Sequence, residues 1–127
     1  MEKEPVVWII DSQQWPRAYL RAELIARGFD AIGFEEVSHA LAARRHAGYA
    51  TPHIIVLELC GLSPKGSELS ALAQTGIPII VLGGAVELSQ SWIEEIQSEA
   101  TLQRPFTIGD VADLVEKSVR DKMEIPE

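Results

Sequence analysis

Short runs of hydrophobic residues divide the chain at regular intervals. The runs are rich in β-branched residues and do not alternate with polar residues, which is typical of strands buried on both faces of a sheet. Three runs are strong, and two weaker ones lie at residues 31–34 and 100–103. The strong runs are Val6–Ile10, Ile54–Leu57 and Ile77–Leu82. The pattern therefore predicts five strands, and the third of them ends in Glu58.

Between these runs, apolar residues recur at helical spacing. Pro16 falls near the first turn of the segment 14–27 and Gly28 at its C-terminal cap, positions that these two residues favour in helices. Leu88, Trp92 and Ile96 lie four residues apart, which predicts one further helix. The five predicted helices cover residues 14–27, 38–46, 67–74, 87–98 and a last segment that begins at residues 109–110.

Strict alternation of strands and helices predicts an α/β fold with a parallel sheet and helices on both of its faces. Ligand sites in such sheets lie at the carboxyl ends of the strands. Asp11 follows the first strand, Glu58 ends the third and Arg104 follows the fifth. We expect these three side chains to converge on one rim. Residues 1–122 are expected to form a single domain, followed by a tail or linker remnant at residues 123–127.

Composition and charge narrow the classes of function. The 127 residues carry a net charge of −8, which excludes a direct binder of nucleic-acid phosphates, because such proteins need clustered positive charge. A single cysteine excludes an internal disulfide. No apolar run approaches the ~18 residues of a membrane span. We expect a cytoplasmic protein without membrane contact. The chain also lacks the Gly-x-Ser-x-Gly and His-Glu-x-x-His motifs, so we expect no catalytic residues and no enzyme activity.

Seven sequence landmarks occur in a specific order over residues 6–119. They are Val7–Asp11, Gly28–Ala31, Ala40–Leu41, Pro52–Leu59, Gly66, Pro78–Leu82 and Leu102–Phe106. Together they resemble the receiver domain of response regulators in two-component (phosphorelay) signalling, the CheY-like family. The resemblance implies a flavodoxin-like three-layer sandwich with a five-stranded parallel sheet and five helices, in which a β-α unit is repeated five times.

The chain departs from that family at the positions that carry its chemistry. Family members hold Mg²⁺ with clustered carboxylates and accept a phosphoryl group on an aspartate. Of the chemical positions, this sequence keeps only Asp11. Ser12 stands at the second acidic position, and Glu58 stands at the phosphoacceptor position. Gly83 replaces a Thr or Ser, and Arg104 replaces a lysine. The resemblance thus implies a degenerate phosphorylation pocket, that of a pseudo-receiver.

Each replacement has a physical consequence. Mg²⁺ prefers octahedral oxygen ligands, so loss of a carboxylate at Ser12 should leave Mg²⁺ binding weak or absent, and we expect no cofactor and no metal site. Glu58 is one methylene longer than aspartate, and phosphoryl transfer tolerates misplacement poorly. The planar guanidinium of Arg104 suits a carboxylate, so we expect it to pair with Glu58, Asp11 or both. The resemblance also implies a cis bond before Pro105.

The resemblance further implies a surface for partner proteins, built from the fourth helix, the fifth strand and the fifth helix. Its residues here are Trp92, Glu95, Thr101 and Asp110. Thr101 stands where a switching aromatic ring is usual in the family. We expect phosphorylation-independent protein–protein interaction with other signalling proteins: a histidine kinase, an output domain or a second copy of the chain.

Two alternatives remain open from the sequence. In the first, the domain is a working switch in which Glu58 or Asp11 accepts a phosphoryl group, or Mg²⁺ binds through Asp11 and the backbone near Cys60. In the second, the segment from Gly61 to Ser67, together with the Gly83–Gly84 step, binds a nucleotide or another small molecule. That segment has the spacing of a phosphate-binding loop but lacks the lysine that follows its second glycine.

Overall fold

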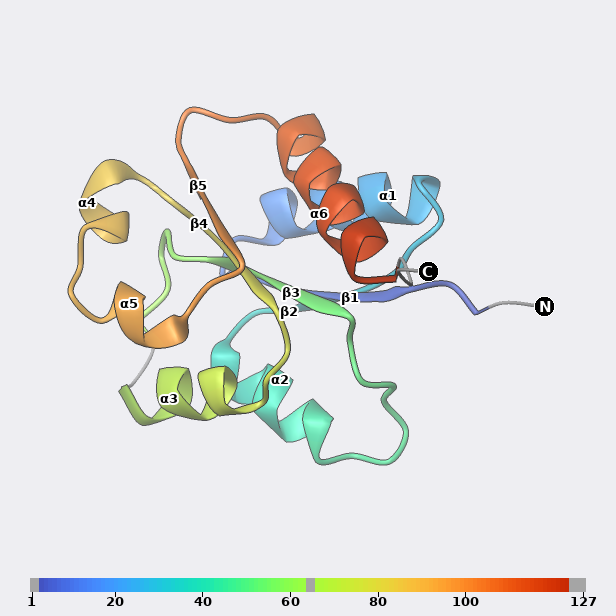
Figure 1. Cartoon of the computed structure of the whole chain (residues 1–127), viewed down its shortest axis with the longest axis horizontal. Helices are drawn as coiled ribbons and strands as arrows, with labels where there is room; N and C mark the ends of the chain where they lie inside the picture. Colours follow the sequence, from blue (N-terminus) through green and yellow to red (C-terminus); the bar gives the residue numbers. More distant parts are fainter. Residues whose placement is uncertain (1–2, 64–65, 124–127) are drawn as a thin grey trace.

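The five predicted strands form one parallel sheet. A computed structural model describes residues 3–63 and 66–123, and the strands lie in the order β2-β1-β3-β4-β5 (Figure 1). They are β1 (Val6–Ile10), β2 (Asp30–Phe34), β3 (Ile54–Glu58), β4 (Ile79–Gly83) and β5 (Ala100–Gln103). The strand order reverses between β1 and β3, so the ends of these two strands mark the point where sites form in such folds.

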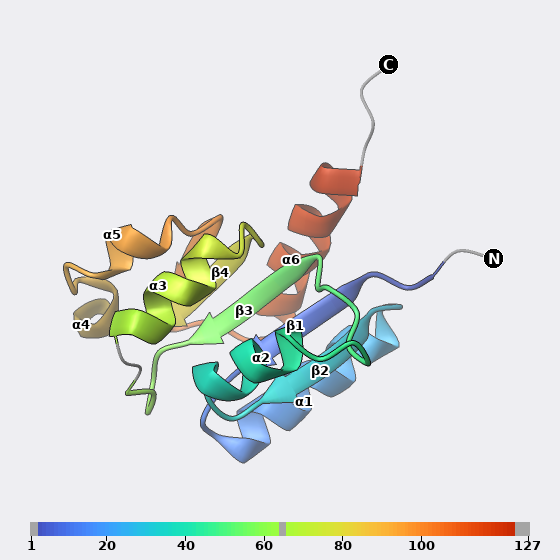
Figure 2. The same cartoon turned by 90° about the horizontal axis from the view of Figure 1, so that it is seen from below.

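Helices cover both faces of the sheet, as the alternating pattern predicted. The first layer holds α1 (Gln14–Ala26) and α6 (Ile108–Met123). The second layer holds α2 (Val37–Arg44), α3 (Gly66–Gln74) and α5 (Ile93–Ile96). Figure 2 shows α2 and α3 in front of the strands, and α1 at the outer edge of the sheet beside β2. The predicted three-layer α/β sandwich is therefore confirmed.

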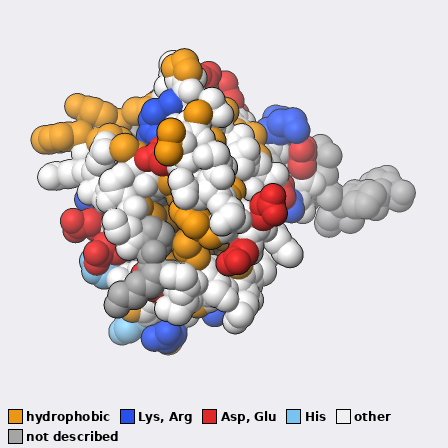
Figure 3. Space-filling model, turned by 90° about the vertical axis from the view of Figure 1, so that its left-hand side faces the viewer, with side chains coloured by type: hydrophobic (Ala, Val, Ile, Leu, Met, Phe, Trp, Pro, Cys, Tyr) orange, Lys and Arg blue, Asp and Glu red, His pale blue; other side chains and the backbone are white. Residues whose placement is uncertain are grey.

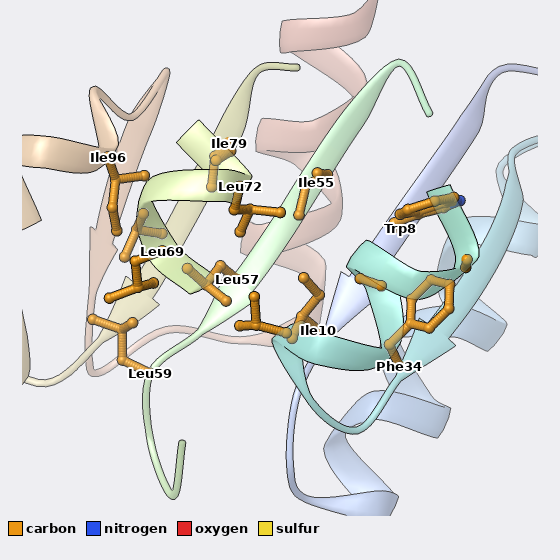
Figure 4. Close-up of a cluster of buried hydrophobic side chains, with 14 of the residues drawn as sticks. Trp8, Ile10, Phe34, Ile55, Leu57, Leu59, Leu69, Leu72, Ile79 and Ile96 are labelled. Carbon is orange, nitrogen blue, oxygen red and sulfur yellow. The ribbon is translucent and has the colours of Figure 1, made fainter. Parts of the chain in front are cut away.

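Two hydrophobic clusters hold the layers together. Every residue of β1, β3 and β4 is buried, which explains why their sequences do not alternate. Successive side chains point to opposite layers: Val7 and Ile9 face α1 and α6, whereas Trp8 and Ile10 face α2 and α3. The Trp8 ring lies 4.9 Å from that of Phe34 (Figure 4). The central strands are thus fixed, and so are the residues at their carboxyl ends.

The number of helices differs from the prediction. One helix was expected over residues 87–98. Two helices of four residues are found instead, α4 (Ala85–Leu88), which begins before the expected start, and α5, so the described residues hold six helices. The backbone carbonyl of Val86 accepts hydrogen bonds from Ser89 Oγ at 2.7 Å and from Gln90 Nε2 at 3.1 Å. These side chains compete for the carbonyl that would continue the helix, which favours a turn.

The last helix runs to Met123, and residues 124–127 of the expected tail lie outside the described residues. The same holds for residues 64–65, in the loop that resembles a phosphate-binding segment. Among the described helices, none has the length and apolar character that a membrane span requires.

Candidate functional site

The residues singled out by sequence lie at one end of the sheet. Asp11 directly follows β1, Glu58 ends β3, Gly83 ends β4 and Arg104 directly follows β5. Because the strands are parallel, all four positions fall on the same rim. Figure 3 views the molecule from this end, with acidic side chains spread over the surface. The convergence that the sequence predicted is therefore present.

Both carboxylate oxygens of Glu58 are engaged. Arg104 Nη2 donates to Oε1, and the backbone N–H of Cys60 donates to Oε2 at 2.9 Å. The Glu58 residue is only 4% exposed, so burial strengthens this charge-assisted contact. Of the two pairings that the sequence left open, Arg104 makes the one with Glu58. No ion pair joins Arg104 to Asp11 in the described part of the chain.

Arg104 is held in place by further groups. Its Nη1 lies 3.9 Å from Glu87 Oε1, and its guanidinium carbon lies 4.9 Å from the centre of the Phe106 ring. Its backbone N–H donates to the carbonyl of Gly83, and the peptide bond to Pro105 is cis. Burial opposes the charge of Arg104, but the hydrogen bond and charge of Glu58 outweigh it and raise the pKa of Arg104. The side chain therefore stays cationic beside Glu58.

Asp11 is buried beside this pair. Its Oδ1 accepts the backbone N–H of Gln13 at 2.9 Å, and its backbone carbonyl accepts Arg17 Nη1 at 2.6 Å. Burial raises the pKa of Asp11, and the negative charge of Glu58 raises it further. The Gln13 hydrogen bond and the charges of Arg17 and Arg104 act in the opposite direction. Asp11 therefore holds its proton more tightly than an exposed aspartate.

The loops after β1 and β3 bind each other. Ser12 Oγ donates to the carbonyl of Cys60 at 3.3 Å, and Gln13 Nε2 donates to Cys60 Sγ at 3.4 Å. Gly61 has a φ of +76°, and a Cβ there would lie 2.7 Å from Ser12 Oγ. The left-handed backbone and this close approach both require glycine. Ser12 thus acts as a link between loops.

The end of β4 is occupied by Glu87 from the next helix. A Cβ on Gly83 would lie 3.3 Å from both Cβ and Oε1 of Glu87. The same Oε1 accepts the backbone N–H of Gly84 at 2.6 Å, which fixes the carboxylate at the start of α4. Space beside Gly83 is therefore taken by a side chain that also approaches Arg104.

These contacts engage several of the oxygens that could bind a cation. Both oxygens of Glu58 and one of Asp11 accept hydrogen bonds, as does the carbonyl of Cys60. Ser12 supplies a hydroxyl and no carboxylate. In the described ranges, no group of three or more His, Cys, Asp or Glu side chains has the arrangement of a metal site. Two carboxylates, one of them paired with Arg104, are a poor fit to the octahedral set of oxygen ligands that Mg²⁺ prefers.

The residues expected to form a partner surface lie apart from this pocket and are mainly polar. Glu95 on α5, Thr101 on β5 and Asp110 on α6 are exposed. Trp92 precedes α5 and is half-buried against the α2–α3–α5 cluster. Asp110 Oδ2 accepts the backbone N–H of Thr107, so it also caps the start of α6.

Sequence reasoning missed three contributors to the pocket. Glu87 approaches Arg104, Gln13 binds both Asp11 and Cys60, and Arg17 binds the backbone of Asp11. The spacing Gly84-x-x-Glu87 is that of a helix start with an acidic third residue, which is a signal available in the sequence. Gln13 and Arg17 carried no comparable signal, because their roles depend on how the loop folds.

Comparison by sequence gives one partial match. No family model matches the chain. It is 34% identical over 97 residues to the signal recognition particle 54 kDa protein of Staphylothermus marinus. The match covers 76% of this chain but 21% of that protein, so the chain spans about a fifth of the length of its curated relative.

Comparison with solved structures gives matches to response regulators and their receiver domains. The beryllofluoride-activated NtrC receiver domain matches with a TM-score of 0.75 at 22% identity, covering 98% of this chain and 100% of that one. The receiver domain of the Francisella response regulator 1452 matches with a TM-score of 0.73 at 20% identity, covering 94% of this chain and 99% of that one. The chemotaxis response regulator CheY4 of Vibrio cholerae matches with a TM-score of 0.72 at 15% identity, covering 91% of this chain and 98% of that one. The chain therefore has the CheY-like fold of response-regulator receiver domains.

Proposed function

We propose that the domain is a pseudo-receiver: a non-enzymatic module of two-component signalling that recognises partner proteins without being phosphorylated. The observation that carries this proposal is the state of Glu58. The sequence resemblance assigns it the phosphoacceptor position, and both of its carboxylate oxygens are engaged, one by Arg104 and one by the Cys60 N–H. An oxygen in that state is a poor nucleophile towards phosphorus, because attack would first have to break the contact of the buried Glu58 carboxylate with Arg104.

Charge neutralisation also argues against phosphoryl transfer. The reaction needs a cation to offset the charge of the phosphoryl oxygens, and positioning within a fraction of an ångström. One carboxylate oxygen of Asp11 accepts the Gln13 N–H, and the Ser12 hydroxyl donates to the carbonyl of Cys60. We therefore propose that Mg²⁺ binds weakly or not at all and that the domain works without a cofactor.

The pocket favours a single state. In a switch, the charge at the phosphoacceptor position changes and a hydroxyl near β4 follows it. Here the carboxylate of Glu58 is held by Arg104, and Gly83 has no side chain to follow a change. Arg104 holds Glu58 from β5, so the pocket and the β5 strand are coupled in one arrangement. We propose that this fixed state is the one that partners bind, whether a histidine kinase, an output domain or a second copy.

Phosphotransfer from a small donor tests the proposal. The full chain is incubated with Mg²⁺ and acetyl phosphate, and intact mass reports the transfer of a phosphoryl group with release of acetate. We expect no mass gain for the wild-type chain or for Glu58→Gln. A mass gain in the wild type that is lost in Glu58→Gln or Asp11→Asn would mean that the domain is a working phosphoacceptor.

The nucleotide alternative has its own test. Thermal unfolding of the full chain with ATP or GTP, with and without Mg²⁺, reports binding to the native state. We expect an unchanged midpoint. A rise in the midpoint that depends on nucleotide concentration, and that a substitution of Ser67 abolishes, would replace the proposal with a nucleotide-binding module.

A further inference from the structure

A groove of about 710 Å³ lies between α1 and the edge strand β2. Figure 2 shows these two elements side by side at the outer edge of the sheet. Ala22, Ile25 and Ile32 give the groove apolar walls, and Arg17 and Arg21 give it a basic border. Clefts of ~300–1,000 Å³ are typical of small-molecule sites, which combine apolar walls with a few polar groups. The groove therefore has the size and the composition of a site for a small molecule.

Gly33 on β2 allows Arg17 to lie against the strand. A Cβ at this position would lie 3.0 Å from both Cγ and Cδ of Arg17, which is closer than ordinary van der Waals contact. The backbone of Gly33 does not have a positive φ, so this close approach, and not the backbone conformation, favours glycine here. Any larger residue would push the stem of Arg17 away from the strand and change the border of the groove.

Both arginines are held in place by backbone carbonyls. Arg17 Nη1 donates to the carbonyl of Asp11 at 2.6 Å, and Arg21 Nε donates to the carbonyl of Ala31 at 2.8 Å. A guanidinium has more N–H donors than these contacts use, so each arginine keeps donors for a further acceptor. Because both side chains are already ordered, binding an acceptor costs less conformational entropy.

The charges of the two arginines are not neutralised by ion pairs. In the ranges 3–63 and 66–123, no carboxylate lies within ion-pair distance of Arg17 or Arg21, whereas Arg27 on the same helix forms several such pairs. Asp11 acts on Arg17 through charge at longer range. Arg17 and Arg21 lie four residues apart on α1, so their like charges repel each other. An anion bound between them would relieve this repulsion.

We propose that this groove binds a small organic acid. Its carboxylate would lie between the guanidinium groups of Arg17 and Arg21, because a planar guanidinium can pair with both oxygens of a carboxylate. Its apolar body would lie against Ala22, Ile25 and Ile32, where binding removes apolar surface from water. The site goes beyond the proposed function, since it does not depend on the state of Glu58.

Other occupants use only part of these features. Inorganic phosphate would pair with the arginines but would leave the apolar walls in contact with water. An anionic membrane would attract the two arginines but repel a chain with a net charge of −8. An added β-strand would need the outward backbone groups of β2, where Arg21 occupies the carbonyl of Ala31 and Arg17 covers Gly33.

Arg17 also connects the groove to the pocket at the strand ends. The guanidinium that would bind the acid already binds the carbonyl of Asp11, so a ligand that draws on Arg17 changes this hydrogen bond. The Ser12 N–H belongs to the same peptide group as the Asp11 carbonyl, and the Ile32 N–H belongs to that of the Ala31 carbonyl. The amide signals of Ser12 and Ile32 therefore report on the two arginines directly.

The test is an amide NMR titration of the full chain labelled with ¹⁵N. The probes are phenylpropionate and hexanoate, the neutral amide of each acid, and inorganic phosphate. We expect at least one acid to bind at about millimolar concentration, as is usual for molecules of this size, and to shift the amides of Ser12, Ile32 and Gly33. The matching amide should bind at least about tenfold more weakly, because it lacks the charge. Salt should weaken binding of the acid.

Three results of this titration would overturn the proposal. The first is that neither acid shifts these amides. The second is that an acid and its neutral amide bind equally well, which would leave the arginines without a role. The third is that inorganic phosphate binds as well as the acids, which would leave the apolar walls without a role.

Four variants sharpen the test. We expect Arg21→Gln to weaken binding of the acid by about tenfold, and Ala22→Phe to weaken it at least as much by filling the groove. Arg44→Gln and Ala42→Phe make the same two changes on α2 and should bind like the wild type. All four positions are exposed, so folding should persist. Wild-type affinity in Arg21→Gln or in Ala22→Phe would contradict the proposed site.

Two further measurements separate the remaining possibilities. Flotation with vesicles of phosphatidylcholine and phosphatidylglycerol reports a membrane surface, and flotation that Arg21→Gln abolishes would overturn the proposal of a free acid. Adding Mg²⁺ and then beryllofluoride to the complex with the acid tests the proposed function separately. Shifts at Asp11, Glu58 and Gly83 on that addition would contradict the pseudo-receiver function, whereas absent binding of the acids would contradict only the groove.

Discussion

Arg104 reaches from the end of β5 to bind Glu58 at the end of β3, across the strand that separates them in the sheet. In the proposed pseudo-receiver, the contact joins the residue that replaces the phosphoacceptor to the residue that replaces the lysine. In this chain the two form an ion pair, with Glu58 almost fully buried and Arg104 40% exposed. The proposed function therefore places the pair where a working receiver would hold its phosphoryl group.

Removing the arginine should expose the cost of a buried, unpaired carboxylate. We expect Arg104→Met to lower the free energy of unfolding by about 2 kcal/mol, because Glu58 then keeps only the hydrogen bond from the Cys60 N–H. Solvent can reach the site of Arg104, which makes the expected loss smaller than for a fully buried pair. Urea denaturation measures this. Lys117→Met, which breaks an exposed pair with Asp121, is the control and should change stability by less than about 0.5 kcal/mol. Adding Glu58→Gln to Arg104→Met should restore part of the loss. Equal stability of Arg104→Met and the wild type would contradict this account.

Asp11 should make the stability of the folded chain depend on pH, and a substitution of Asp11 separates this effect from that of other groups. Its pKa is raised above the ordinary value of 3.8, so the folded chain holds this proton more tightly than the unfolded chain. The resulting stability is fully present below pH 3.8 and is lost as pH rises through the folded pKa. The side chain in Asp11→Asn stays neutral at every pH. The free energy of unfolding of this variant, relative to the wild type, should therefore increase as pH rises through the folded pKa of Asp11. Urea unfolding of both proteins from pH 3 to pH 7 measures the difference. Two parallel curves would show that Asp11 titrates normally.

Gly83 should tolerate a side chain only when Glu87 is shortened. We expect Gly83→Thr to destabilise by about 1 kcal/mol, because its Cβ would press on Cβ and Oε1 of Glu87. In the background of Glu87→Ala the same substitution should cost less. A double-mutant cycle by urea unfolding measures the coupling. A coupling energy of zero would mean that Glu87 moves aside freely.

Gly61 and Gly28 form a matched pair of left-handed glycines. Both have positive φ, but a Cβ on Gly28 meets nothing within 4 Å, whereas one on Gly61 meets Ser12 Oγ. We expect both alanine variants to lose about 1 kcal/mol from backbone strain, with an added loss at Gly61 only. Ser12→Ala should reduce that added loss. If Gly28→Ala and Gly61→Ala are equally stable, the close contact between the two loops is not tight.

Much of the fold could be predicted because strands buried on both faces consist of continuous apolar residues, which are visible in the sequence. The continuous apolar runs of β1, β3 and β4 correspond to strands in which every residue is buried. The prediction of one helix over residues 87–98 was wrong. Periodicity shows only which side chains are apolar and does not show where a helix ends. It does not report that Ser89 and Gln90 bind the Val86 carbonyl and end the helix.

The site could be predicted in outline for a related reason. Parallel strands bring Asp11, Glu58 and Arg104 to one rim whatever the loops do, so their convergence follows from topology. The sequence left open whether Arg104 would choose Glu58 or Asp11, because that depends on side-chain reach across β4. It also gave no indication that Ser12 would bind Cys60, since hydrogen bonds between loops depend on how each loop turns.

The most direct test of the pseudo-receiver account is an amide NMR titration of the full chain, first with Mg²⁺ and then with beryllofluoride, a phosphoryl mimic. The account predicts flat shifts at Asp11, Glu58 and Gly83 at millimolar Mg²⁺, because both carboxylate oxygens of Glu58 and one of Asp11 already accept hydrogen bonds within the protein. Shifts at these amides with Mg²⁺, spreading to Thr101 and α6 with beryllofluoride, would show a working switch and contradict the account.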